Sequence, residues 1–295
     1  MTRPAVDVVV PFRGAAAELD RLRARLAGLE LADDDTLTVV DNAPDRPAGG
    51  AAEPVIAAPG LQTPGFARNR GADRGIAPWI VFLDADVVAP ADLVEAYFQE
   101  WPGPATGMLA GGIRDQRPDP AAPVAPRYAY LRSSMSQEMT LQHGRWGFTQ
   151  TANCACLREA FEAVGGFRES IRAGEDADLC FRLRDAGWST ERREHAAVTH
   201  RNRETVGQLL RQKATHGAAG AWLDREYPGS FPPRRLPGLT WWAARRAVTG
   251  VVDAARTRRR EEALLAVMDP LTTLAYELGR SLPNERPLRR GRGFR

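Results

Sequence analysis

Short apolar runs alternate with helical patterns through the first half of the chain. A β-branched run from Val6 to Val10 predicts a strand that ends at Pro11, and leucines at helical spacing follow between Glu18 and Leu31. Three more strands are expected at Thr36 to Val40, Glu53 to Ala58 and Trp79 to Leu83. This alternation is typical of βαβ units, so we expect an α/β fold with a mostly parallel central sheet.

The second half is less regular and ends in a different kind of segment. Expected strands are Gly107 to Ile113, Phe148 to Leu157 and a short one that closes at Val198; expected helices are Arg158 to Val164 and Asp176 to Ala186; residues 117–126 read as a loop. Four prolines between Tyr227 and Pro237 would interrupt any helix. We therefore place a domain over residues 1–227 and a mainly helical extension over residues 228–295.

Two amphipathic helices are expected in the extension, at Leu239 to Arg258 and Glu262 to Leu278. The second has five apolar residues on one face: Leu264, Val267, Leu271, Leu274 and Leu278. The arginine-rich tail that follows is expected to be disordered.

Composition narrows the class of protein. With 295 residues and 43 % hydrophobic content, the chain can fill a sizeable core. It has no apolar run of membrane-spanning length and no signal-peptide pattern, so we expect a cytoplasmic protein that does not span a membrane. Cys154, Cys156 and Cys180 are expected to be reduced core thiols, because no second cysteine pair or histidine cluster completes a zinc site.

Charge is unevenly distributed. The chain has a net charge of +3, but Arg234 to Arg295 holds 14 arginines and 6 acids, so the extension is strongly basic and the body acidic. A nucleic-acid partner is not expected, because such proteins carry positive charge on the body of the fold. Trp241, Trp242 and the neighbouring Arg245-Arg246 suggest peripheral contact with the inner face of a membrane. Packing on the first domain, or in a homodimer, remains the alternative.

Two carboxylates follow the fully apolar strand that ends at Leu83. Asp84 and Asp86 are separated by one residue, and such a pair can hold Mg²⁺ or Mn²⁺ through oxygen ligands beneath a diphosphate. Acids also occur at strand ends simply as turn formers. Ligands of open α/β sheets bind beyond the carboxyl ends of the strands, so this pair should meet Arg13 and Asp41 at one crevice.

A second acidic cluster begins the expected helix at residue 176. Glu175, Asp176 and Asp178 could cap this helix, but three acids in four positions exceed that need, and one of them could accept a proton from a hydroxyl. A third motif, Gly65 to Gly71, would let the backbone approach a ligand and let Arg68 reach phosphate; alternatively it is a glycine-flanked surface helix.

Taken in order, these motifs resemble the family 2 glycosyltransferases with the GT-A fold, over roughly residues 5–225. The ordered series is V-V-V-P-F-R at 8–13, V-V-D-N at 39–42, G-F-A-R-N-R-G at 65–71, F-L-D-A-D at 82–86, A-V-G-G-F at 163–167 and G-E-D-A-D-L-C-F-R-L at 174–183. The resemblance implies inverting, metal-dependent transfer of one sugar from a nucleotide sugar, UDP-linked by default, to a hydroxyl of a glycan, lipid-linked or small-molecule acceptor.

The resemblance also implies roles for residues. The donor would be bound by residues that lie within four of the motifs: Pro11, Phe12, Arg13, Asp41, Arg68, Asn69, Asp84, Ala85 and Asp86. The Mn²⁺ or Mg²⁺ ligands would be Asp84, Asp86 and His200. Asp176 would be the general base, with Glu175 orienting the acceptor in a site that also includes Asn153 and Trp188. Trp188 could equally be a core residue.

This chain departs from the family pattern in ways that narrow the activity we expect. Processive members carry Q-x-x-R-W, whereas this chain has Gln208, Arg211 and then Gln212, so we expect addition of a single sugar. A nucleotidyltransferase acting on sugar phosphates would need a glycine-rich loop with a lysine, which the segment from Phe12 to Ala16 lacks. A non-catalytic sugar-nucleotide-binding protein remains the other alternative, and the full set of acids argues against it.

Overall fold

The computed structural model describes residues 3–45, 54–234, 236–257 and 259–286, which fall into two compact units. Unit 1 comprises Met1–Arg114, Ser136–His200 and Glu285–Arg295, and unit 2 comprises Asp115–Met135 and Arg201–Asn284. We predicted a boundary after residue 227; in the division into compact units, the helix Val206–Glu226 belongs to unit 2, because it packs on the helix Arg260–Gly279. The arginine-rich tail, for which we predicted disorder, lies outside the described residues.

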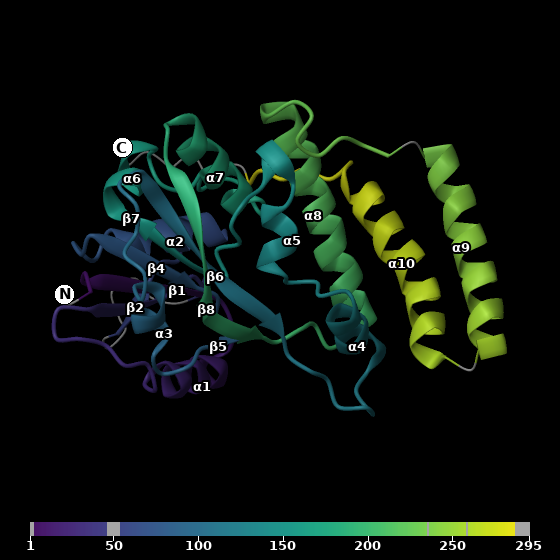
Figure 1. Ribbon diagram of the computed structural model, residues 1–295, viewed down its shortest axis with the longest axis horizontal. Helices are drawn as coiled ribbons and strands as arrows, with labels where there is room; N and C mark the ends of the chain where they lie inside the picture. The colour runs from purple at the N-terminus through teal and green to yellow at the C-terminus, as the bar shows by residue number, and fades with distance from the viewer. Residues whose placement is uncertain (1–2, 46–53, 235, 258, 287–295) are drawn as a thin grey trace. The chain divides into compact units, whose positions relative to one another are not determined.

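Unit 1 is built on one eight-stranded sheet (Figure 1). Its strands are β1 (Val6–Phe12), β2 (Thr36–Asp41), β3 (Val55–Ala57), β4 (Trp79–Leu83), β5 (Val87–Val88), β6 (Thr106–Asp115), β7 (Asn153–Leu157) and β8 (Ser189–His200), in the order β3-β2-β1-β4-β7-β6-β8-β5. The first four are parallel, whereas β7 runs antiparallel to β4 and β6, and β5 antiparallel to β8. The predicted α/β fold is confirmed, and its parallel part comes from the first half of the chain.

Helices cover both faces of this sheet. They are α1 (Ala16–Leu26), α2 (Pro64–Ala72), α3 (Leu93–Tyr97), α5 (Gln137–Leu141), α6 (Arg158–Ala163) and α7 (Glu175–Asp185). Residues of α2, α6 and α7 share a core cluster with Val9 of β1. Val8 and Val10 point to the opposite face and are equally buried. Cys154, Cys156 and Cys180 are buried and free, as predicted.

The strand register brings the chemically active segments to one edge of the sheet. Phe12 and Asp41 are paired at the ends of β1 and β2, so the residues that follow them leave the sheet side by side. β4 is parallel to β1 and ends at Leu83, which places Asp84 at the same edge. The pairing of Val87 with His200 brings the end of β8 there as well.

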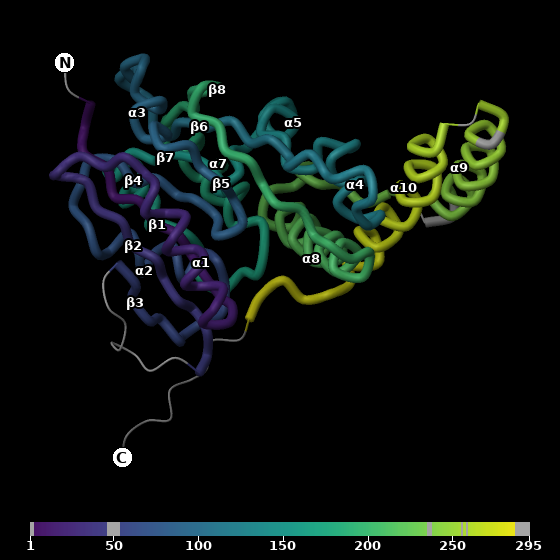
Figure 2. The backbone as a smooth tube through the Cα atoms, turned by 90° about the horizontal axis from the view of Figure 1, so that it is seen from below, coloured from purple at the N-terminus to yellow at the C-terminus, as the bar shows by residue number. Residues whose placement is uncertain are grey.

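Unit 2 consists of α4 (Val124–Leu131), α8 (Val206–Glu226), α9 (Leu236–Thr257) and α10 (Arg260–Gly279) among its described residues. Helix α10 packs between α8 and α9 (Figures 1 and 2). Close approach of α8 and α10 depends on glycine: a Cβ on Gly217 would lie 1.9 Å from the Tyr276 carbonyl oxygen, and one on Gly279 would lie 2.1 Å from that of Ala214. Within the described residues, no helix is long and apolar enough to cross a membrane.

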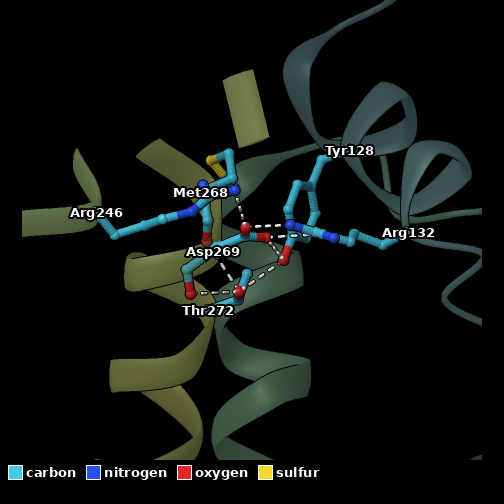
Figure 3. Close-up of polar contacts among 6 residues, drawn as sticks. All are labelled: Tyr128, Arg132, Arg246, Met268, Asp269 and Thr272. Atoms are coloured by element: carbon cyan, nitrogen blue, oxygen red, sulfur yellow. Dashed lines mark hydrogen bonds and ion pairs between the residues drawn. The ribbon is translucent and has the colours of Figure 1, made fainter. Parts of the chain in front are cut away.

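Asp269 of α10 joins three helices of unit 2 (Figure 3). Its carboxylate accepts hydrogen bonds from both Nε (2.8 Å) and a terminal nitrogen of Arg132, just after α4, and from Arg246 of α9 at 3.3 Å. The Tyr128 hydroxyl donates to it at 3.2 Å and also lies 2.8 Å from the Thr272 hydroxyl oxygen. Two guanidinium groups balance the negative charge of the Asp269 carboxylate, and these contacts fix which side of α10 faces α4.

Candidate active site

Arg68 connects two carboxylates at the carboxyl edge of the sheet. Its guanidinium donates to Asp84 Oδ1 at 2.6 Å and to Glu175 Oε1 at 2.7 Å, and its side chain is only 3 % exposed. Burial alone would lower its pKa, but the charges of Asp84 and Glu175 raise it. Arg68 therefore holds the end of β4 to the start of α7, whereas we had predicted direct contact with the donor.

Asp86 and His200 meet as the resemblance implied. His200 Nε2 lies 3.3 Å from Asp86 Oδ1, and His200 is 4 % exposed. The β5–β8 pairing is what brings them together, because Val87 follows Asp86 directly and pairs with His200. An imidazole nitrogen and a carboxylate oxygen converging in this way fit two ligand positions of a Mn²⁺ or Mg²⁺ ion.

Asp84 does not complete a three-residue metal cluster with them. In the part of the chain that the structure describes, no group of three His, Cys, Asp or Glu side chains could hold a metal ion. One Asp84 oxygen is paired with Arg68, and the Asp84 side chain keeps 30 % of its surface exposed. Asp86 and His200 are the two predicted ligands that meet in this arrangement, and the ligand role of Asp84 stays a prediction.

The start of α7 places two acids near Arg68 and Asp84. Gly174 has φ = 81°, a left-handed conformation that suits glycine, and the chain turns there into a first helical turn that contains Glu175 and Asp176. Burial, followed by the nearby Glu175 carboxylate, raises the pKa of Asp176 to about 7. A carboxylate with this pKa is matched to proton transfer near neutral pH.

The third acid of this cluster is a structural residue. Asp178 is fully buried, and its carboxylate pairs with Arg182 at 2.7 Å and Arg168 at 3.2 Å. It has no exposed surface from which to reach a substrate hydroxyl. Asp176 is therefore the better placed of the two for proton transfer.

Two predicted site residues make hydrogen bonds within the fold. The Asn69 amide donates to the Phe167 carbonyl and accepts from the Phe167 N–H, which ties α2 to the segment before α7. Asn153 is fully buried in β7, where it accepts from the Tyr97 hydroxyl at 2.7 Å and donates to the carbonyls of Gly112 and Ala196. In this arrangement both amides bind protein groups, and the donor role of Asn69 and the acceptor role of Asn153 stay predictions.

Trp188 is partly buried. It packs against the core and would be 2.8 Å from a Cβ on Gly107. It also precedes β8, whose twelve residues span about 40 Å before His200 is reached. Its place in the acceptor site stays a prediction.

The remaining predicted donor residues lie at the ends of β1, β2 and β4. Phe12 and Asp41 are buried, Pro11 is partly exposed, and Arg13 is exposed. Asp41 Oδ1 accepts from the Ala43 N–H at 3.1 Å. The Ala85 carbonyl accepts from Arg25 at 2.7 Å, which fixes the turn between the two acids.

Two further arginines near Arg13 were not predicted. The backbone N–H of Arg286 donates to the Ser170 carbonyl at 2.8 Å, beside a bridge between Ile171 and Glu285, so Arg286 lies near Arg172. Burial, with the charges of Arg172 and Arg13, lowers the pKa of Arg286. Like charges gathered in this way favour an anion. Arg286 follows a helical unit in sequence, and no local motif marks it.

Comparison with known proteins is consistent with this site. The model of the family described as glycosyltransferase like family 2 matches residues 28–218. A pre-mycofactocin glycosyltransferase of Mycobacterium tuberculosis is 30 % identical over 255 residues, which cover 83 % of this chain and 53 % of the relative. A validoxylamine A glucosyltransferase of Streptomyces hygroscopicus subsp. jinggangensis is 27 % identical, covering 88 % of this chain and 68 % of the relative. The chain thus spans about half the length of the mycobacterial relative.

Among solved structures, a mannosyltransferase from Pyrobaculum calidifontis in complex with GDP-Man and Mn²⁺ superposes with a TM-score of 0.65. It is 15 % identical, and the match covers 95 % of this chain and 87 % of the other. A likeness at this identity supports the same fold, which is the GT-A fold that the motifs implied.

Proposed function

Because this chain belongs to the glycosyltransferase-like family 2, we propose that it transfers a single sugar from a nucleotide-sugar donor to a hydroxyl acceptor, with inversion at the anomeric carbon. The observation that carries the proposal is the crevice edge itself, where Asp176 with a pKa of about 7 stands beside the Arg68-linked acids Asp84 and Glu175. The supporting comparisons are the relatives, which are named as glycosyltransferases.

In the proposed reaction, Asp176 takes the proton of the acceptor hydroxyl as its oxygen attacks the anomeric carbon. The bond from that carbon to the diphosphate oxygen breaks, and the nucleoside diphosphate leaves with the electron pair. A single displacement inverts the configuration. Glu175 is held by Arg68 and shapes the acceptor side, and its charge keeps the pKa of Asp176 high enough for the proton to be accepted near neutral pH.

A divalent cation fits the donor side. Asp86 and His200 would hold it, because their oxygen and nitrogen atoms converge to 3.3 Å. When bound, the cation offsets the negative charge of the diphosphate. The mannosyltransferase of similar fold contains Mn²⁺ with its nucleotide sugar, which supports Mn²⁺ as the first ion to test.

The anionic donor is also matched by positive charge. Arg13, Arg172 and Arg286 gather near the end of β1, where the resemblance placed donor-binding residues. We take uridine as the first choice of base from that resemblance. Guanosine is the comparison, because the structural neighbour holds GDP-Man.

The proposal is tested by calorimetric titration of UDP and GDP, each with and without Mn²⁺, into the wild-type chain and into Asp86→Ala. We expect nucleoside-diphosphate binding that Mn²⁺ strengthens and that Asp86→Ala weakens. A sugar-transfer assay with a panel of UDP- and GDP-sugars then separates an enzyme from a binding protein. Absence of binding by any nucleoside diphosphate would overturn the proposal.

A further inference from the structure

Helix α9 carries apolar residues on two opposite sides. Leu239, Ala243 and Ala254 are buried, and α9 packs on α10. Trp241 and Val248 lie on the other side and are 64 % and 65 % exposed. A surface helix with one partner needs only one apolar side, so the second side of α9 indicates a second contact.

Helix α10 continues this exposed surface. Val267, Leu271 and Leu278 are 42 %, 41 % and 67 % exposed, although they share a face that we predicted from the sequence as apolar. At about 100° per residue they lie roughly 160–180° around the helix from Asp269, whose carboxylate faces α4. They therefore lie on the side of α10 that is turned away from α4.

We define the outer apolar surface as the exposed residues on these sides of α9 and α10, together with the leucine just after α10. They are Trp241, Val248, Val251, Val252, Val267, Leu271, Leu278 and Leu282, each at least 41 % exposed. The other described residues leave at least this fraction of each side chain exposed. Exposed apolar side chains gathered on neighbouring helices in this way indicate an interaction site.

Arginine side chains lie beside the exposed side of α9. Arg245 follows Trp241 by one turn, and its guanidinium lies 5.2 Å from the centroid of a Trp241 ring. Arg256 is a further exposed arginine of α9, and Asp253 is the only acid of that helix. In α10, Asp269 is directed toward Arg132 and Arg246, and Glu277 is only 8 % exposed. Asp269 and Glu277, the acids of α10 nearest in sequence to Leu271 and Leu278, are thus turned inward, whereas Glu261 and Glu262 at the start of α10 are exposed and Glu262 pairs with Arg259.

We propose that the outer apolar surface lies on the anionic face of a lipid bilayer, with α9 at the interface and no segment of α9 or α10 crossing it. Tryptophan and valine would enter the headgroup boundary, and Arg245 and Arg256 would meet lipid phosphates. A second copy of the chain fits less well, because a symmetric contact would bring these arginines toward one another.

The test is co-sedimentation of the full chain with phosphatidylcholine vesicles that contain or lack phosphatidylserine. The wild type should bind the anionic vesicles, and added salt should weaken binding because the attraction is screened over about 8 Å at physiological ionic strength. The double variant Trp241→Ser/Val248→Ser should lower the partition coefficient about tenfold or more, since two apolar side chains no longer enter the bilayer.

A matched control is Trp101→Ser, which removes a tryptophan of 62 % exposure from unit 1 and should bind vesicles as the wild type does. Arg245→Gln/Arg256→Gln should reduce binding to the anionic vesicles about tenfold or more and reduce the salt dependence. Thermal unfolding of each variant confirms that it is folded.

Three outcomes overturn the proposal. One is binding that does not depend on phosphatidylserine, which would remove the role of charge. The second is the absence of vesicle binding by a wild type that stays monomeric in light scattering. The third is the absence of vesicle binding together with a dimer that Trp241→Ser/Val248→Ser dissociates, which would assign the surface to a second copy.

Discussion

The crevice of unit 1 and the helices of unit 2 use charged and apolar residues in opposite ways. In the crevice, Arg68 is buried between Asp84 and Glu175, and apolar side chains are in the core behind them. In unit 2, the Asp269 ion pairs lie between helices, while large apolar side chains such as Leu278 are exposed. Charged side chains gathered at the edge of the sheet therefore indicate a reaction site. Exposed apolar side chains indicate a surface that contacts another molecule or a membrane.

The largest expected effect is on proton transfer in the crevice. Asp176→Asn keeps the size of the side chain but cannot accept a proton, so turnover should fall by about 10²–10⁴-fold. Donor and Mn²⁺ affinity should stay within about twofold, as for residues that contribute only to the reaction step. Turnover and calorimetric donor binding are measured on one preparation.

The matched control for this change is Asp185→Asn, at the exposed end of the same helix, which should leave turnover unchanged. The melting temperature of Asp176→Asn at pH 8 should equal or exceed that of the wild type, because burial disfavours the Asp176 charge. A lost donor affinity would show instead that Asp176 shapes the binding site.

The pH dependence of the reaction gives the next largest effect. The pKa of Asp176 is raised to about 7, so the carboxylate is the dominant form only above that pH. Turnover should rise about tenfold per unit of pH below 7 and level off above it. Glu175→Gln removes a charge that raises this pKa, so the acid limb of the profile should move to lower pH. An unmoved limb would assign the titration to another group.

Loss of the buried arginine should have a large effect on stability. Arg68→Met leaves the Asp84 and Glu175 carboxylates unpaired in a site where the arginine is 3 % exposed, so we expect a loss of about 3–5 kcal/mol in the free energy of unfolding. Arg70→Met is the control on the same helix, because Arg70 is 44 % exposed and pairs with Glu169 at the surface. Its loss should be below about 1 kcal/mol by denaturant unfolding.

The sequence predicted the parts of the site that follow from strand ends. Asp84 and Asp86 directly follow an apolar strand, and parallel strands present their carboxyl ends at one edge, so their location required no long-range information. The pairing of Asp86 with His200 was also anticipated, but through the resemblance. Its physical cause, the two-residue strand β5, is too short to show an alternating pattern.

The side-chain contacts that the sequence did not predict join distant segments of the chain. Asn69 lies within a motif and Asn153 within an expected strand, yet their partners, Phe167 and Tyr97, are 98 and 56 residues away in sequence. In the helices, periodicity identified the face that holds Leu271 and Leu278 but did not show whether it is covered. Periodicity reports which residues share a side, and only packing decides which side is buried.

A moderate effect is expected from the ion pairs within unit 2. Asp269→Asn removes the charge that offsets Arg132 and Arg246 and keeps the shape, so unfolding should be easier by about 1–3 kcal/mol. Asp253→Asn, at an exposed position of α9, should change it by less than about 0.5 kcal/mol. Donor affinity of Asp269→Asn should not change. An equal change in the free energy of unfolding for the two variants would show that the Asp269 ion pairs add little to stability.

The smallest expected effect concerns an exposed leucine of α10, and it tests whether the outer apolar surface contributes to the fold. Leu278 is 67 % exposed, so Leu278→Gln gives up little buried area and should change the free energy of unfolding by less than about 0.5 kcal/mol. Met268 on the same helix is 3 % exposed, and Met268→Gln should cost about 2–5 kcal/mol because it buries an amide in place of a thioether. Chemical denaturation of both variants measures the difference. If Leu278→Gln lowered the free energy of unfolding as much as Met268→Gln does, Leu278 would be packed in the folded chain. It would then not be available to contact a bilayer. If it is neutral in solution yet lowers vesicle binding, the leucine is retained for contact with the membrane and not for the fold.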